Sequence, residues 1–374
     1  WMYLEKMYFA NNAFYDVAPE SFLFKLTSLS GSSPKNNLAN MFASLMGDCH
    51  LDDPIRAQRN FLEQQVVDTL RAPDILEDYG QLASHRLIST DITEKPYLPF
   101  LTEFFVRDLK FLADHPRYHI ERLGDLLKLY SYLYTSQLAL NMKGWRGGEP
   151  TVKPVYFMLE GERASQEREA LVQNGHQNVA RQLSSLFPYL SLSEYLQEPG
   201  WVKKEHRKPL WDLAACLDNS DADKLKVYAK KFALERFGED YKFPFDETET
   251  SPRYWLDALL QLSVKQFDKG RGREAALSRF IKQIEENLCV SFVKSRGRLG
   301  KILIINQDYL SLITNLVIRE QGKLRFHELI EAFAARGICF DKQSQQALIR
   351  FYERVGNVER MSDSGDAVYV RSTI

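Results

Sequence analysis

Cysteine is scarce in this sequence of 374 residues, with only four at widely separated positions. These residues, Cys49, Cys216, Cys289 and Cys339, include no pair at the spacing of a zinc finger. We therefore expect no structural zinc site and no disulfide in what resembles a cytosolic chain. Each cysteine is predicted to be a small packed side chain rather than a reactive thiol.

Long apolar runs are also missing. No stretch of about 18 consecutive apolar residues occurs, so no segment is expected to cross a membrane. The beginning lacks the pattern of a secretory signal. The sequence opens on Trp1 rather than on methionine, so we expect further residues upstream of it.

The recognised catalytic and nucleotide-binding motifs are absent. The sequence has no glycine-rich phosphate loop, and the nearest fragment, residues 297–301, lacks the spacing and the following hydroxyl. No signature of a serine or cysteine nucleophile or of a zinc peptidase occurs. The sequence therefore predicts a protein that is not an enzyme and needs no cofactor. A magnesium-dependent nuclease built on scattered carboxylates stays open as an alternative.

The net charge of −1 excludes a wholly basic nucleic-acid-binding chain, but the charges are unevenly distributed. Residues 265–374 contain 19 Lys and Arg against 13 Asp and Glu, whereas residues 1–264 contain 30 against 37. An acidic larger part joined to a basic end is typical of a protein that holds a protein partner with one part and a polyanion with the other.

Most of the chain has the apolar periodicity of helices. An aromatic-rich segment at residues 1–30 is expected to be helical and packed, and residues 55–70 form an amphipathic pattern. Residues 155–159 are a short apolar run that predicts a buried strand. Further helices are expected at residues 102–113, 120–140, 167–186 (ended by Pro188), 209–217, 221–237 (capped by Ser220), 255–264 and 275–286.

The last segment, residues 306–374, has the element order of a winged helix. A first helix at 307–320 begins at Asn306 and is ended by Gly322, and a short strand follows at 323–326. A second helix ends near Gly337, and Asp341 caps a third helix. Two short strands at 358–361 and 367–370 flank a turn-forming run at 362–366.

The third helix of such a module enters the major groove of DNA, and the hairpin contacts the backbone. Here the polar face of that helix carries residues suited to adenine and guanine edges or to phosphates. The predicted contacts from the module are Lys342, Gln343, Gln346, Arg350, Lys323, Arg325, Arg360 and Ser364. A solvated helix face, or a module that binds only protein, is the competing interpretation.

Two basic glycine-containing loops precede this module, at residues 269–273 and 295–301. Arginine and lysine on a glycine-rich backbone can contact phosphates without reading sequence. The candidates are Arg271, Arg273, Arg296, Arg298 and Lys301. Mobile surface turns with solvated charges would have the same composition.

Several segments resemble one family. The run at 306–310, then Phe340 and Asp341, and the ending 362–371 are similar to the C-terminus of the DNA phosphorothioation-dependent restriction protein DptG, also called DndG. The run at 154–160 with Arg168 is similar as well. The similar segments cover about a quarter of the chain, and none of them contains a catalytic motif.

That resemblance implies a bacterial defence role. Members of the family act with an ATPase partner, DptF (DndF), and a helicase-like partner, DptH (DndH), against double-stranded DNA that lacks the sulfur mark. The resemblance assigns no catalytic residue.

We therefore expect a mainly α protein: a multi-helical N-terminal and central region with few short strands, followed by a C-terminal winged-helix (α/β) module. The predicted division is a helical partner-binding region at 1–240, a helical segment with the basic loops at 253–301 and the winged helix at 302–374. Residues 241–252 are predicted to form an exposed linker. The expected function is a cytoplasmic DNA-binding and scaffolding subunit; an adaptor that binds only protein is the alternative.

Overall fold

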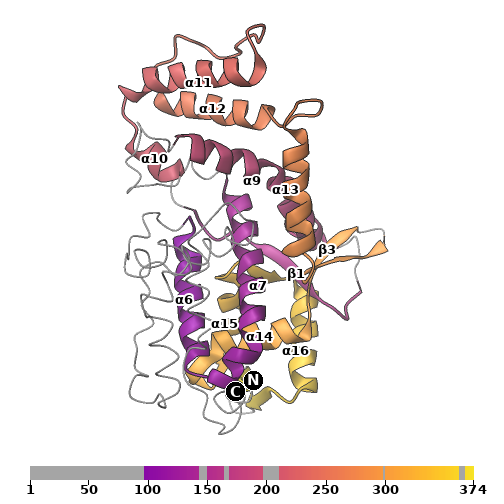
Figure 1. Ribbon diagram of the computed structural model, residues 1–374. Coiled ribbons are helices and arrows are strands. Elements are labelled where there is room, and N and C mark those ends of the chain that lie inside the picture. The colour runs from indigo at the N-terminus through magenta and orange to yellow at the C-terminus, as the bar shows by residue number, and fades with distance from the viewer. Residues whose placement is uncertain (1–96, 143–149, 164–167, 197–209, 298–299, 362–366) are drawn as a thin grey trace, which may run out of the picture.

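The computed structural model describes residues 97–142, 150–163, 168–196, 210–297, 300–361 and 367–374. Helices dominate these residues and strands are few and short, which confirms the mainly α prediction (Figure 1). The helices expected before residue 97, Cys49, the turn at 362–366, Arg298 and Ser364 lie outside the described residues. None of the described helices is long and apolar enough to span a membrane.

The helices before the winged-helix segment are α6 (Pro99–Ala113), α7 (Pro116–Asn141), α8 (Glu169–Asn174), α9 (His176–Leu196), α10 (Leu210–Cys216), α11 (Asp221–Phe237), α12 (Pro252–Lys265) and α13 (Glu274–Asn287). α6 packs against α7, and α7 also packs against α9. α12 lies between α9 and α11, so α11 forms the end of the molecule farthest from the winged helix (Figure 1).

Four short strands form a small mixed sheet. Its strands are β1 (Val155–Leu159), β2 (Val293–Ser295), β3 (Lys301–Ile305) and β5 (Ile338–Phe340), in the order β2-β3-β1-β5. β1 is central and parallel to both β3 and β5, while β2 is antiparallel to β3. The chain passes from β1 to β3 on one side and then crosses to β5 on the other.

Successive side chains of β1 point to opposite faces of this sheet. Phe157 of β1 meets Tyr132 of α7 and Phe292 in the main hydrophobic core. Met158 points the other way, where it forms a smaller cluster with Leu171 of α8 and Ile304 of β3. This period of two is the geometry of a strand buried on both faces.

The winged helix consists of α14 (Gln307–Ile318), β4 (Lys323–Arg325), α15 (Phe326–Ala334), α16 (Lys342–Arg354), β6 (Val358–Met361) and β7 (Ala367–Arg371). Its sheet has the order β4-β7-β6. The predicted caps are present: Asn306 Oδ1 accepts the Tyr309 N–H at 2.9 Å and Asp341 Oδ1 accepts the Ser344 N–H at 2.8 Å. An added feature is β5, which lies between α15 and α16 and hydrogen-bonds to β1.

Three local predictions need correction. The helix expected at 167–186 is divided at Gly175, and α9 continues through Pro188 instead of ending there. Ser220 precedes α11 but its side chain makes no capping bond, because its hydroxyl donates to Asp218 instead. The helix expected at 275–286 was predicted to bury Leu277, Phe280, Ile281 and Ile284, but only Ile284 is fully buried, since one side of α13 faces solvent.

Residues 241–251 lie along α11 and α12 rather than away from them. Phe243 stacks on Trp255 with ring centroids 6.2 Å apart, and the Trp255 indole N–H donates to the Glu249 carbonyl at 2.9 Å. One continuous core cluster extends from α6 through α12 to β7. The described helices and the winged helix therefore share a single hydrophobic core.

Candidate functional site

A buried ionic cluster centred on Arg168 fixes the start of α16. The Arg168 guanidinium donates from Nε and Nη2 to the two carboxylate oxygens of Asp341, at 2.7 and 2.6 Å. Its Nη1 donates to Glu162 at 2.9 Å, and Nη2 also donates to the Ser344 hydroxyl at 2.6 Å. The Arg168 side chain is only 5% exposed. One guanidinium thus connects the end of β1, the residues before α8 and the first turn of α16.

Further hydrogen bonds join this cluster to strand β1. Ser344 donates to Glu162 Oε1 at 2.8 Å, and the same oxygen accepts the Leu159 N–H at 2.7 Å. For Asp341, burial raises the pKa, but hydrogen bonds from Arg168 and Ser344 outweigh burial and hold the pKa below its usual value. α16 therefore begins at a fixed position relative to β1.

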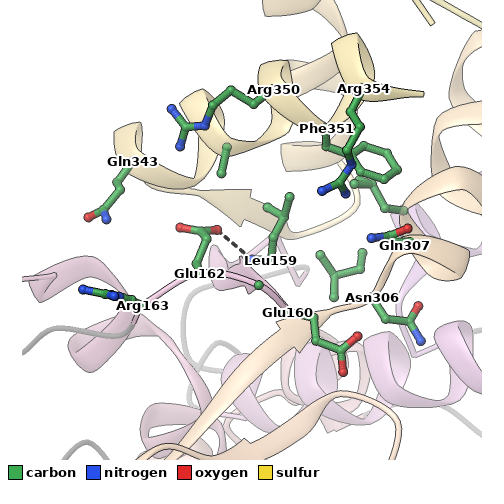
Figure 2. Close-up of a pocket in the computed structure, with 14 residues that line it drawn as sticks. Leu159, Glu160, Glu162, Arg163, Asn306, Gln307, Gln343, Arg350, Phe351 and Arg354 are labelled. Carbon is green, nitrogen blue, oxygen red and sulfur yellow. Dashed lines mark hydrogen bonds between the residues drawn. The ribbon is translucent and has the colours of Figure 1, made fainter. Parts of the chain in front are cut away.

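A groove lies at the carboxyl ends of β1 and β3, between them and α16. Its volume is about 580 Å³. Leu159, Ile305, Leu310, Ala347 and Phe351 form its apolar floor. Polar residues surround that floor: Glu160, Glu162, Arg163, Asn306, Gln307, Gln343, Arg350 and Arg354, with Gly161 at the turn (Figure 2).

The charges of this groove are unbalanced. Among the described residues, Arg163, Arg350 and Arg354 have no carboxylate within salt-bridge distance. Glu162 and Asp341 share the single positive charge of Arg168, so the buried cluster has one more carboxylate than guanidinium groups. Glu160 is exposed, and its carbonyl accepts a bond from Arg296 Nη2 at 2.7 Å. Three guanidinium groups and the exposed carboxylate of Glu160 therefore line the groove, with the Arg168 cluster behind them.

The predicted contacts on α16 are all present on its surface. Lys342, Gln343, Gln346 and Arg350 are exposed, as expected from the apolar stripe on the opposite side. Gln343 and Arg350 line the groove, whereas Lys342 and Gln346 lie outside it. The face of α16 predicted to contact DNA is thus open to solvent and borders the groove.

The predicted cations of the wing are each engaged locally. Lys323 forms a salt bridge with Glu359 at 3.2 Å, and Arg360 forms one with Glu353. Arg325 donates from Nε to the Tyr369 hydroxyl at 3.1 Å. Exposed pairs of this kind contribute little stability, about 0 to 1 kcal/mol, and can exchange for a phosphate. They are nevertheless less available than Arg350.

The two basic loops lie at opposite ends of α13, about 21 Å apart by helical rise. Arg271 packs its guanidinium 4.7 Å from the Phe237 ring centroid, and Arg273 donates to Gln266 at 3.3 Å. Burial lowers the pKa of Arg273, and the nearby Arg236 lowers it further. At the other end, Lys301 pairs with Glu285 at 2.9 Å. Arg296, by contact with Glu160, is the described loop residue nearest the groove.

Sequence reasoning missed Arg163 and Arg354. Arg354 could have been found, because Gln343, Ala347, Arg350 and Arg354 follow the spacing i, i+4, i+7, i+11 of one helix face. Arg163 stands in a turn and carries no comparable signal. The run 302–305 between Gly300 and Asn306 is a continuous apolar segment that indicates a strand, and that strand places Asn306 at the groove.

Two of the three cysteines in the described residues are at least partly buried. Burial raises the pKa of Cys289 to about 12, and Glu285 contributes in the same direction. Cys339 is partly buried, whereas Cys216 is exposed rather than packed. No group of three metal-ligating side chains occurs in the part of the chain that the structure describes.

Comparison of the sequence with models of protein families and with curated proteins finds no match. The resemblance to the DptG family therefore stays an interpretation of the sequence. Some residues of these segments lie together: Leu159, Glu160, Asn306 and Gln307 line the groove, and Arg168 pairs with Asp341 behind it. The described residues of the ending, 367–371, form β7 and line neither.

Proposed function

We propose that this chain is a DNA-binding and scaffolding subunit without an active site of its own. In this proposal α16 contacts duplex DNA with its exposed polar face. The observation that carries it is the combination of an exposed recognition helix with a fixed start, set by Arg168, Asp341 and Ser344. A helix held in this way can present the same side chains to a duplex in each encounter.

The surrounding charges support contact with a polyanion. Arg350 on α16 and Arg163 opposite it have no salt-bridge partner among the described residues, so binding a phosphate would not require a pair to be broken. Gln343 and Gln346 add amide groups that can pair with base edges. Phosphate contacts dominate affinity, so we expect binding that weakens steeply with salt and depends weakly on sequence.

The wider assignment follows the sequence resemblance. On that basis the chain would act in a bacterial phosphorothioation-dependent restriction complex with an ATPase and a helicase-like subunit. The long helical part, α6 to α13, would supply the scaffold for these partners. An adaptor in which α16 docks on a partner protein instead of DNA is the second candidate, favoured by the carboxylate pairing of Lys323 and Arg360.

Fluorescence anisotropy with a labelled duplex of about 20 base pairs tests DNA binding. The variant Lys342→Glu with Gln346→Glu changes α16 outside the groove. We expect this variant to bind roughly tenfold more weakly at low salt and to show a shallower salt dependence.

The matched control is Lys224→Glu with Lys231→Glu on α11, at the far end of the molecule (Figure 1). This control should bind like the wild type. Equal affinities for the α16 variant and the control would overturn contact through α16. If the wild-type chain fails to bind duplex at low salt but copurifies with the ATPase partner, the adaptor is correct.

A further inference from the structure

The groove between α16 and the carboxyl ends of β1 and β3 has the composition of a binding site for a small phosphorylated molecule. In sheets with parallel strands, ligands bind outside the carboxyl ends of the strands, at the point where successive connections diverge to opposite sides. β1 is such a point, because β3 lies on one side of it and β5, which comes later in the chain, lies on the other.

Three arginines supply positive charge to the lining of the groove. Arg350 and Arg354 are four residues apart on α16, which places their Cβ atoms about 6 Å apart on the same face. Arg163 lies across the groove on the turn after β1 (Figure 2). Guanidinium groups form charge-assisted, paired hydrogen bonds with phosphate oxygens, and this makes arginine the preferred side chain for such recognition.

The N-terminus of α14 adds to the positive electrostatic potential of the groove. Gln307 and Asn306 line the groove at the amino end of this helix of 12 residues. Asn306 caps the Tyr309 N–H, and the N–H groups of the first turn carry the positive end of the helix dipole. The helix end therefore reinforces the three arginines.

The floor of the groove is apolar rather than charged. Phe351 and Leu310 are buried beneath it, with Leu159 and Ala347 partly buried beside them. A volume of about 580 Å³ lies within the range of small-molecule sites, roughly 300 to 1,000 Å³, and exceeds what a lone phosphate fills. An apolar floor beneath a cationic rim is suited to a phosphate attached to an organic body.

We propose that this groove binds a phosphate ester, with Arg163, Arg350 and Arg354 contacting the phosphate. The ester can belong to a free nucleotide or to the backbone of DNA, since the phosphate chemistry is shared. The inference does not depend on DNA binding through Lys342 and Gln346, because those side chains lie outside the groove.

Isothermal titration calorimetry of the full chain with adenosine 5′-monophosphate, inorganic pyrophosphate and adenosine tests the proposal. Adenosine lacks the phosphate and should bind at least tenfold more weakly than its monophosphate. The variant Arg350→Ala with Arg354→Ala should weaken binding of the phosphorylated probes roughly tenfold or more. Both side chains are exposed, and a melting temperature within a few degrees of wild type will confirm that the variant is folded.

The matched control is Lys224→Ala with Lys231→Ala, which removes two cations from α11, far from the groove, and should leave these affinities unchanged. The same variants are also measured for binding to the labelled duplex that tests DNA binding. Loss of nucleotide binding in the double arginine variant identifies a free phosphate ester as the ligand. Loss confined to duplex binding, with the α11 control unchanged, identifies the DNA backbone.

If the double arginine variant matches the α11 control with every probe, the groove is not a phosphate site. That result would leave DNA binding through Lys342 and Gln346 standing. Conversely, arginine-dependent nucleotide binding by a chain that does not bind duplex would support the groove and remove the DNA-binding proposal.

Discussion

At the scale of single residues, Gly337 shows how tightly the connection before β5 is packed. Its φ of +85° is a conformation that side chains with a Cβ rarely adopt. A Cβ there would lie 2.2 Å from Gln137 Nε2. Gln137 cannot easily move, because its side chain donates to and accepts from the Lys153 backbone at 2.7 and 2.9 Å. Only glycine satisfies both restrictions.

Replacing Gly337 with alanine is therefore expected to destabilise the protein by more than backbone strain alone. Gly356→Ala is the control, because Gly356 has a similar φ of +76° but open space around its Cβ position. Strain costs about 1 to 2 kcal/mol at either position. Urea unfolding should show Gly337→Ala to be at least about 1 kcal/mol less stable than Gly356→Ala. Equal losses would mean that Gln137 moves aside without cost.

At the scale of elements, the position of α16 depends on its N-cap residue. Asp341→Asn keeps an oxygen that can cap Ser344 but removes the charge that pairs with Arg168. We expect a loss of about 2 to 3 kcal/mol near neutral pH, because a buried guanidinium loses one of its carboxylates. The control, Asp308→Asn in the first turn of α14, changes an exposed carboxylate and should cost less than about 0.5 kcal/mol.

The same pair predicts a pH dependence. The pKa of Asp341 is depressed in the folded state, so its ionised form contributes stability above the unfolded pKa of about 3.9. That contribution decreases as the pH falls through the lower folded pKa. The stability difference between wild type and Asp341→Asn should be constant near neutral pH and shrink below about pH 4. A difference that persists unchanged at acidic pH would show that the charge of Asp341 is not responsible.

Element prediction succeeded where the signal was local. Val155–Leu159 was predicted as a strand, and Asp341 was predicted as the cap of the third helix, because apolar runs and capping oxygens act over a few residues. β5 was missed because three residues are too few for a pattern, and its partner β1 lies about 180 positions earlier. Arg168 and Asp341 are 173 positions apart, so their pairing also carries no local signal.

The helix end predicted at Pro188 was wrong for the opposite reason: a strong local signal was present, but tertiary packing overrode it. Proline removes a backbone donor and usually ends or bends a helix. Here Leu186, Tyr189 and Leu192 are buried on both sides of Pro188. The Pro188 carbonyl also accepts the Ser263 hydroxyl of α12 at 2.7 Å. Packing against α7 and α12 therefore carries the helix through a residue that propensity alone would place at its end.

At the scale of the whole molecule, Asp108 joins the helical part to the winged helix. This carboxylate on α6 accepts from Arg319 after α14 at 2.7 Å and from Arg336 after α15 at 2.8 Å. Tyr130 of α7 donates to it as well. Burial raises the pKa of Tyr130 well above its usual value, and the negative charge of Asp108 raises it further, so the phenol stays a donor.

Asp108→Ala should consequently lower the free energy of unfolding, because Arg319 and Arg336 would be left without their buried carboxylate. Asp108 is 1% exposed, so we expect a loss of about 3 to 5 kcal/mol in chemical denaturation. Glu121→Ala removes a carboxylate from the exposed pair with Arg117 and should change stability by less than about 0.5 kcal/mol. A small loss at Asp108 would indicate that the two parts are joined by apolar packing alone.

The strand β5 leaves α16 without a hinge. Phe340 is hydrogen-bonded into the register of β1, and only Asp341 separates it from the first residue of the helix. A linker able to absorb rotation is absent from that junction. Force applied to α16 by a bound molecule would therefore pass straight into the backbone ladder between β5 and β1, and the helix and the sheet would respond as one rigid piece.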